Sequence, residues 1–258
     1  MWTRLRIPAL LISALIAAPS LGAQSTAEHI TLGDHAYAER AVQAALNHYQ
    51  AAIATAPSNY EALWKASRAE VDLAEAAGKG RLGDSLMILA EQHAHAAIAV
   101  NPANAEGHFS LARADGRKAL SLGIMDRIKY AKIVRNEALE ALKYDSLHAG
   151  ALHVLGVWNA EVMRVNGFAR AFARTFLGAQ VFGLANWNDA QRYLELAVKV
   201  DPDRVVHRLD LGTVYMDRHD KTRARATFES MANVPLHDLN DELYKRLATE
   251  RLNKLGAP

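Results

Sequence analysis

The chain of 258 residues contains no cysteine. Disulfides, thiolate zinc sites, a cysteine nucleophile and the lipidated cysteine of a bacterial lipoprotein are therefore excluded. An excess of one charge sign is also missing, because 30 basic residues face 28 acidic ones. Binding to nucleic-acid phosphates needs a standing excess of Lys and Arg on one surface. We therefore predict no nucleic-acid partner.

The N-terminal residues have the layout of a secretory signal peptide. Arg4 and Arg6 precede an apolar run of about 12 residues, which small residues then follow. A helix that spans a bilayer needs roughly 20 residues, so the run is short for a membrane anchor. We expect cleavage after Ala23, which divides the chain into a signal at 1–23 and a mature domain at 24–258. The predicted location is the periplasm or the outside of the cell, and the alternative is a buried N-terminal helix.

Long stretches of strict apolar and polar alternation are absent from the mature chain, so nothing argues for a sheet. Apolar residues instead recur three and four positions apart, and the composition is rich in Ala, Leu, Glu, Arg and Lys. That spacing places apolar side chains on one face of a helix. The sequence therefore predicts an all-α protein.

Four segments of similar sequence each contain the end of a predicted helix and the turn that follows it. After each turn a new predicted helix begins, and these helices also resemble one another in sequence. Helix pairs that recur in this way cannot each bury a core alone and must stack. The turns end at Pro57, Pro102, Ser146 and Pro202. The predicted units are 30–57, 60–102, 105–146, 149–202 and 205–235, and a capping helix at 241–255 follows them.

The sequence pattern of these units resembles the tetratricopeptide repeat (TPR). This repeat of about 34 residues has small residues where its two helices cross and a proline at the turn that ends it. Residues at pattern positions in the first unit are Leu32, Gly33, Ala45, Tyr49, Ala52 and Pro57. Those in the last unit are Leu211, Gly212, Tyr215, Ala224 and Phe228. The resemblance implies a TPR-like α-solenoid of about five helix pairs with a C-terminal capping helix.

Spacing between the turns departs from the repeat pattern. Successive turns lie 45, 44 and 56 residues apart, where about 34 is expected. We therefore expect insertions between the helices of the interior pairs, at 76–84, 120–128 and 165–186.

A more specific resemblance rests on the segment Leu147–Trp158, on the aromatic and basic stretch after it, and on the segment NWNDAQRYLELAVKVDP. These motifs resemble the regulator of microtubule dynamics family, from about Tyr60 to Leu255. The resemblance implies a helical repeat fold, and some members are associated with lipid binding. An export signal favours a bacterial envelope protein that meets no microtubules.

The first helix of each pair in a solenoid forms the concave wall, which is the usual binding surface. The predicted groove residues are Trp64, Arg68, Phe109, Arg113, Arg117, His153 and Glu161. Two aromatic residues are each followed four positions later by an arginine, which puts each pair on one helix face. Such a wall suits a peptide with a carboxylate, which arginine binds with two parallel hydrogen bonds. In the alternative interpretation, the aromatic residues belong to the core and the arginines pair with Glu61, Asp72, Glu106 or Asp115.

The insertion at 165–186 is unusually aromatic, with Phe168, Phe172, Phe176 and Phe182. Three of these recur every four residues and give one aromatic helical face with basic flanks. Such a face can lie on an anionic membrane surface. Alternatively, the insertion folds back and plugs the repeat core.

A literal GxGxxG pattern occurs at Gly78, Gly80 and Gly83. A dinucleotide site needs this loop to follow a parallel strand and to open a helix whose N-terminal amides face the pyrophosphate. Here a predicted helix precedes the loop, so we interpret Gly78 as the residue that ends this helix. We expect no cofactor.

His93 and His95 suggest a metal site, because the chain has 11 histidines. Zinc sites need three or four convergent ligands, and side chains two residues apart on a helix point in different directions. We interpret both as surface or groove residues and predict no metal. No GxSxG nucleophile elbow and no Walker-type phosphate loop occurs either.

The sequence as a whole predicts a non-enzymatic scaffold that binds a protein or peptide partner in its concave groove. The alternative is a carrier of a lipid or a small apolar ligand that uses the insertion at 165–186.

Overall fold

A computed structural model describes residues 24–167, 170–171, 175 and 180–256. These residues form eleven α-helices and two short 3-10 helices, and no strand occurs among them. The prediction of an all-α protein is therefore confirmed. The predicted signal at 1–23 lies outside the described residues.

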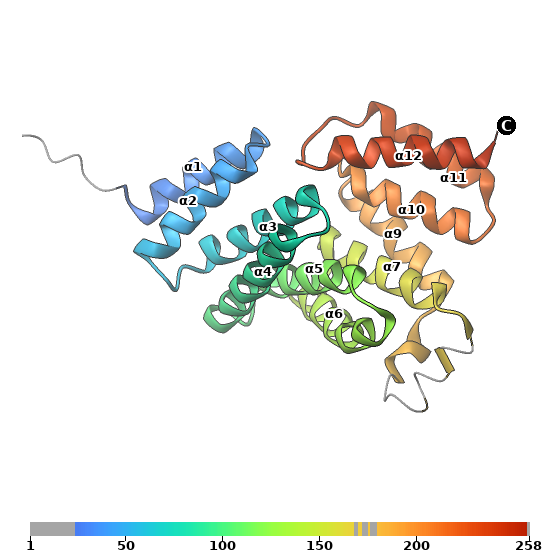
Figure 1. Cartoon of the computed structure of the whole chain (residues 1–258), viewed down its shortest axis with the longest axis horizontal. Coiled ribbons are helices and arrows are strands. Elements are labelled where there is room, and N and C mark those ends of the chain that lie inside the picture. The colour runs from blue at the N-terminus through green and yellow to red at the C-terminus, as the bar shows by residue number, and fades with distance from the viewer. Residues whose placement is uncertain (1–23, 168–169, 172–174, 176–179, 257–258) are drawn as a thin grey trace, which may run out of the picture.

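Ten of the helices form five consecutive pairs, and a last helix follows them (Figure 1). The pairs are α1 (Thr26–Ala38) with α2 (Val42–Thr55), α3 (Tyr60–Ala77) with α4 (Arg81–Val100), α5 (Ala105–Ser121) with α6 (Ile124–Tyr144), α7 (Ala149–Arg164) with α9 (Trp187–Val200), and α10 (Val205–Asp217) with α11 (Lys221–Ser230). The remaining elements are η1 (Gln180–Leu184), η2 (Met231–Asn233) and α12 (Asp241–Leu255).

Polar side chains at the turns start the first helix of several pairs. The side chains of Asn59, Asn104 and His148 each accept a hydrogen bond from a backbone amide in the first turn of α3, α5 and α7. Such caps satisfy amides that have no partner inside the helix. The similar residues at the end of each turn therefore cap the N-terminus of the helix that follows.

Glycines of the repeat pattern lie where the two helices of a pair touch. A Cβ atom built on Gly33 would lie 2.4 Å from the ring of Tyr49, and one built on Gly212 would lie 2.4 Å from the ring of Phe228. Both aromatic side chains are buried in the facing helix. The small residue thus admits an aromatic ring from the second helix, which explains why the two residue types occur together in the pattern.

The extra residues of the second and third units mostly lengthen helices. Helices α3 and α4 have 18 and 20 residues, against 13 and 14 in the first pair. Only residues 78–80 connect α3 with α4, and only 122–123 connect α5 with α6. Two of the three expected insertions are therefore helical extensions, because their sequence continues the helical spacing up to a glycine-containing turn. Gly78 ends α3 with a φ of 68°, as predicted.

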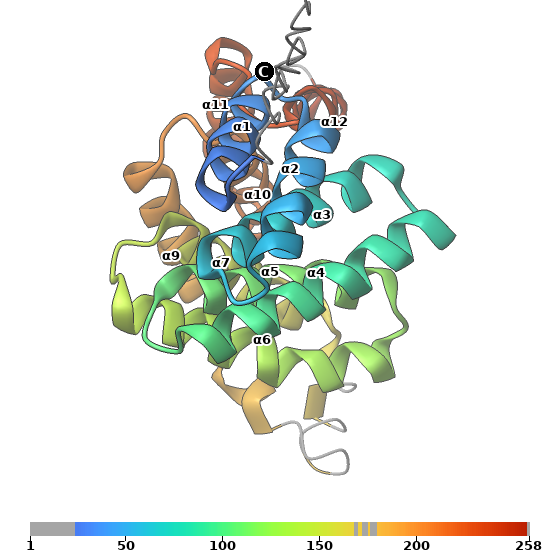
Figure 2. The same ribbon diagram turned by 90° about the vertical axis from the view of Figure 1, so that its left-hand side faces the viewer.

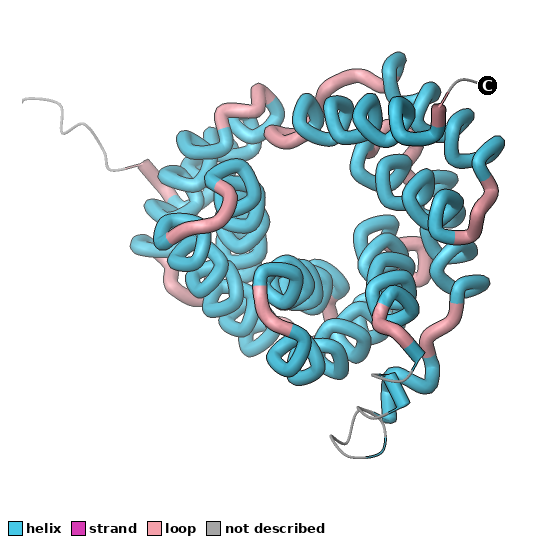
Figure 3. The backbone as a smooth tube through the Cα atoms, turned by 45° about the vertical axis from the view of Figure 1, so that its right-hand side comes forward, coloured by secondary structure: helices cyan, strands magenta, loops and turns pink. Residues whose placement is uncertain are grey.

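The row of pairs curls until its two ends meet (Figures 1 and 3). The N-terminal end of α12 returns to the first repeats, which face the viewer in Figure 2. Asn240 Nδ2 donates a hydrogen bond of 3.0 Å to the backbone carbonyl of Asp72 in α3. Leu239 packs against the core cluster of α1, α2 and α3. The capping helix therefore closes the concave side of the solenoid into a ring.

Candidate functional site

A cavity of about 490 Å³ occupies the middle of the ring. Its walls come mainly from α3, α5, α7 and α10, which are the first helices of their pairs, with contributions from α1, α6 and α12. Six of the seven predicted groove residues line it: Arg68, Phe109, Arg113, Arg117, His153 and Glu161. Figure 3 shows the ring of helices that surrounds this space.

Trp64, the seventh predicted groove residue, does not line the cavity. It is partly buried, and its ring lies 5.2 Å from the Cζ atom of Arg68 and 5.5 Å from the Nζ atom of Lys65. The aromatic residue that lines the cavity near Arg68 is Tyr37 of α1, whose ring centroid lies 3.8 Å from the Cζ atom of Arg68.

Asp72 joins three elements of the polar wall. Its Oδ2 atom accepts a hydrogen bond of 2.5 Å from the hydroxyl of Tyr37, and its Oδ1 atom accepts one from Arg113. Burial and the charge of Asp72 raise the pKa of Tyr37. Burial alone would lower the pKa of Arg113, but Asp72, Tyr37 and Glu75 raise it. The ion pair with Asp72 therefore keeps Arg113 charged and neutralises its charge.

Most arginines that line the cavity have a carboxylate partner. These ion pairs are Arg113 with Asp72, Arg117 with Glu75, Arg127 with Glu161, and Arg204 with Asp238. Arg68 differs from them, because no carboxylate of the described residues lies within 4.0 Å of its guanidinium. Its Nε atom is buried and has no hydrogen-bond partner within that part of the chain. Arg68 is thus a partly buried cation that faces the cavity without a counter-charge.

Two histidines add to the polar wall. His153 Nε2 lies 2.8 Å from Asp210 Oδ2, and the ring of His207 lies 4.7 Å from the ring of His153. Burial lowers the pKa of His207 well below its usual range, and the neighbouring side chains of His153 and Arg204 lower it further. Its buried Nδ1 atom has no hydrogen-bond partner among the described residues. His207 is therefore neutral at neutral pH.

The other end of the cavity has an apolar surface beside the ion pair of Arg127 with Glu161. Val134, Trp158, Val162 and Phe182 line it and belong to one core cluster of α6, α7 and η1. The indole nitrogen of Trp158 donates a hydrogen bond of 2.8 Å to the carbonyl of Ala131, which fixes the ring. Phe182 is the part of the predicted aromatic insertion that the structure describes, and it is buried. The predicted residues Phe168, Phe172 and Phe176 lie outside the described residues.

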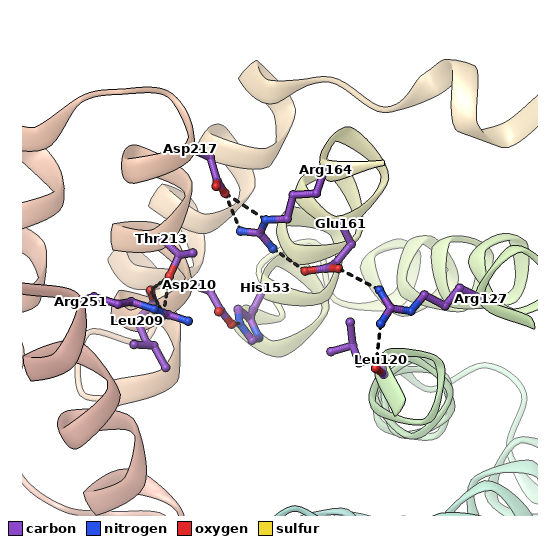
Figure 4. Close-up of polar contacts among 10 residues, drawn as sticks. All are labelled: Leu120, Arg127, His153, Glu161, Arg164, Leu209, Asp210, Thr213, Asp217 and Arg251. Carbon is purple, nitrogen blue, oxygen red and sulfur yellow. Dashed lines mark hydrogen bonds and ion pairs between the residues drawn. The ribbon is translucent and has the colours of Figure 1, made fainter. Parts of the chain in front are cut away.

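Charged side chains tie α6, α7, α10 and α12 together along one side of the cavity (Figure 4). Arg164 of α7 bonds to Asp217 of α10 and to Glu161, and Glu161 also pairs with Arg127 of α6 at 3.7 Å. Arg251 of α12 bonds to the hydroxyl of Thr213 in α10. These contacts span helices that are separate in sequence, so they hold this wall in one arrangement.

The sequence comparison decides the family. The family described as regulator of microtubule dynamics protein 1-3 matches residues 29–256. The chain belongs to this family. The sequence motifs predicted a resemblance to this family from about Tyr60 onwards. The match begins at residue 29, so the resemblance also covers the first repeat.

Solved structures show the fold of this regulator of microtubule dynamics family member. TTC0263, a TPR protein of Thermus thermophilus, has 18% sequence identity and a TM-score of 0.63, with 88% of this chain and 100% of that chain covered. PilF of Pseudomonas aeruginosa has 14% identity and a TM-score of 0.51, with 89% and 86% covered. No curated protein matches the sequence. The fold is thus a TPR-like α-solenoid, a class that serves in general as a scaffold for protein interactions.

Several residues of the site were not predicted from the sequence. The missed residues that line the cavity include Tyr37, Arg204, His207, Asp238, Asn240 and Tyr244. Tyr37 comes from one end of the family member's chain and Asp238, Asn240 and Tyr244 from the other, and these ends meet only because the solenoid closes. No helix in the described ranges has the length and hydropathy needed to cross a membrane.

Proposed function

We propose that this chain is a non-enzymatic binding protein that takes an acidic segment of a partner protein into its central cavity. The observation that carries the proposal is the guanidinium of Arg68, which lines the cavity without a carboxylate partner among the described residues. Removing a cation from water is costly unless an anion or hydrogen bonds compensate for it. A ligand carboxylate at Arg68 supplies that compensation.

The cavity suits a ligand that has an acidic group and an apolar body. Ligand sites are typically concave and mostly apolar, with a few placed polar groups, and their volumes run from roughly 300 to 1,000 Å³. This cavity falls within that range. Arg68 lies on the polar wall, and Phe109 offers an aromatic surface beside the capping residue His148, at a centroid distance of 4.5 Å. An acidic side chain or a C-terminal carboxylate next to apolar residues has this chemistry.

A pulldown with the mature chain, Gln24 to Pro258, tests the proposal. Wild type and Arg68→Gln are compared on extract of the source cells, and the bound proteins are identified by mass spectrometry. A hydrogen bond to a charged group contributes about 1.5–3 kcal/mol, so we expect Arg68→Gln to weaken capture about 10- to 100-fold. Arg81→Gln, at an exposed position at the start of α4, is the matched control. A partner captured equally by wild type and Arg68→Gln contradicts the proposal.

A small amphipathic or apolar molecule, such as a lipid, is the second candidate ligand. The observation that favours it is the apolar end of the cavity, where Trp158 and Phe182 are held in one buried cluster. Organic extraction of the same purified protein, followed by mass spectrometry, distinguishes the two candidates. A stoichiometric lipid without a bound protein favours the carrier function.

We also propose that the protein is exported, because its first residues have the composition of a signal peptide. Expression of the full chain in a bacterium with a periplasm, followed by fractionation and intact-mass measurement, tests this. The expected product is periplasmic and begins at Gln24. A cytoplasmic product that retains the first 23 residues contradicts export.

A further inference from the structure

The segment at 234–244, here called the strap, covers one side of the cavity. It runs from the end of η2 into the first turn of α12, and three of its side chains line the cavity: Asp238, Asn240 and Tyr244. Without the strap, the concave wall would be an open groove of the usual solenoid kind.

Few contacts hold the strap to the first repeats, and we call this junction the seam. Asn240 donates a hydrogen bond to the backbone carbonyl of Asp72, as described above. The Nη1 atom of Arg40 lies 3.8 Å from the Oε1 atom of Glu242. The hydroxyl of Tyr244 interacts with the carboxylate of Glu75 in α3. It also lies 3.5 Å from Arg117 Nη2 in α5, which is long for a hydrogen bond. Apart from the interaction with the Glu75 carboxylate, these contacts are an exposed ion pair and neutral hydrogen bonds, and each of those contributes little to stability. The seam is therefore a weak junction of the ring.

The rest of α12 is anchored on the opposite side of the seam. Tyr244, Ala248, Leu247, Leu252 and Leu255 all pack into the core cluster of the last two repeats. In the cluster of the first repeats, the strap's apolar contribution is Leu239. If the seam opens, the strap therefore moves with α10 and α11 and leaves α1 and α3.

Internal contacts give the strap its shape independently of the seam. Asp241 Oδ2 accepts hydrogen bonds of 2.8 Å and 2.7 Å from the backbone amides of His237 and Asp238. The carboxylate of Asp238 in turn binds Arg204, in the turn before α10. Because neither contact crosses the seam, the strap can part from α3 as a formed unit.

The seam connects to the cation of the proposed site. Asn240 binds the backbone of Asp72, whose carboxylate holds Tyr37, and the Tyr37 ring lies against Arg68. A ligand at Arg68 therefore lies beside the α1 and α3 side of the seam, and Asn240 and Tyr244 face it from the other side of the same cavity. A bound ligand bridges the two sides.

We propose that the seam is the entrance to the cavity: the ring opens between the strap and α3 to admit the ligand, and the bound ligand holds it shut. This inference rests on the proposed binding at Arg68. Ring opening is a small rotation between stacked repeats, which contact only their neighbours along the solenoid.

A covalent link across the seam tests the proposal. Because the chain has no cysteine, Arg40→Cys with Glu242→Cys introduces the only two thiols, and a short bismaleimide joins them. The same double variant capped with N-ethylmaleimide is the unlinked control. The probe is 8-anilinonaphthalene-1-sulfonate, whose sulfonate and aromatic rings supply the acidic group and the apolar body.

Equilibrium titration of the probe comes first and tests the binding site itself. We expect Arg68→Gln to weaken binding at least 10-fold, and equal binding would overturn the proposed function together with the entrance. Stopped-flow mixing then tests the entrance alone. We expect the link to slow both association and release at least 10-fold relative to the capped control. Unchanged rates, with binding still dependent on Arg68, would overturn the entrance and leave the binding site standing.

A second variant, which should speed binding, tests whether the cross-link slows binding only because it distorts the protein. Glu242→Lys places a cation opposite Arg40 across the seam and leaves the cavity lining untouched, since neither residue lines it. We expect association of the probe to become severalfold faster. A rate equal to that of wild type argues against opening at the seam.

Discussion

Asp115 has a buried carboxyl group, and the way the free energy of unfolding changes with pH should reveal its contribution to stability. The residue lies on α5 with 1% of its surface exposed, and its Oδ1 atom has no hydrogen-bond partner within the described residues. Burial raises the pKa of Asp115 to about 7, with a further rise from Glu91 and an opposing effect of Lys118. The folded chain therefore keeps a proton that the unfolded chain loses near pH 4.

The sign of the effect follows from this difference in proton affinity. Because the folded state binds the proton more tightly, the stability is fully present below the unfolded pKa and is lost as the pH rises through about 7. One pKa unit corresponds to about 1.4 kcal/mol, so a rise of about three units corresponds to about 4 kcal/mol. Asp115→Asn keeps the shape of the side chain and removes its charge.

Urea unfolding of wild type and Asp115→Asn between pH 4 and pH 8 measures this contribution. We expect the variant to be about 2–4 kcal/mol more stable than wild type at pH 8, and this advantage to shrink steadily from pH 7 towards pH 4. Asp203→Asn, at an exposed turn position, is the control and should change stability little. An advantage of Asp115→Asn that is the same at every pH would refute the reasoning.

Three further predictions concern packing and can be checked by urea unfolding at neutral pH. Gly212→Ala should cost about 1–3 kcal/mol, because its Cβ would lie 2.4 Å from the Phe228 ring. Gly123→Ala has nothing within 4 Å of its Cβ and should cost clearly less, limited to the smaller preference of the helix N-cap for Gly over Ala; equal effects would contradict the packing argument. Phe182→Ala should cost about 3–5 kcal/mol, since the ring is 5% exposed, and a loss below about 1 kcal/mol would place that ring outside the core. Asn186→Ala should cost about 1 kcal/mol, because the side chain caps α9 at the amide of Asp189; an unchanged stability would argue against the cap.

Local features of the fold were predictable because each depends on a few neighbouring residues. Gly33 and Gly212 mark helix crossings since only a residue without a side chain admits the facing ring. Gly78 ends α3 because its φ of 68° is easily reached by glycine. The groove positions of Arg68 and Phe109 followed from the repeat pattern, which makes the first helix of each pair the concave wall, although the same pattern also placed Trp64 there, which does not line the cavity.

Closure of the ring was not predictable in the same way. It depends on the small rotation between each pair and the next, added over the whole row, and no short motif encodes that sum. The contact of Asn240 with Asp72 spans 168 positions. Tyr37 and Tyr244, from the two ends of the chain, were therefore missed as cavity residues.

The seam also changes how the chain resists local unfolding. In an open solenoid the first and last repeats each have one neighbour, so they fray before the middle does. Here Leu239 gives the first repeat a second neighbour from the far end of the chain. Breaking that contact should loosen the first repeat and the strap together, so amide protons in α1 and in the strap should exchange faster at the same time, although most of the sequence lies between them, while the packed part of α12 keeps its protection.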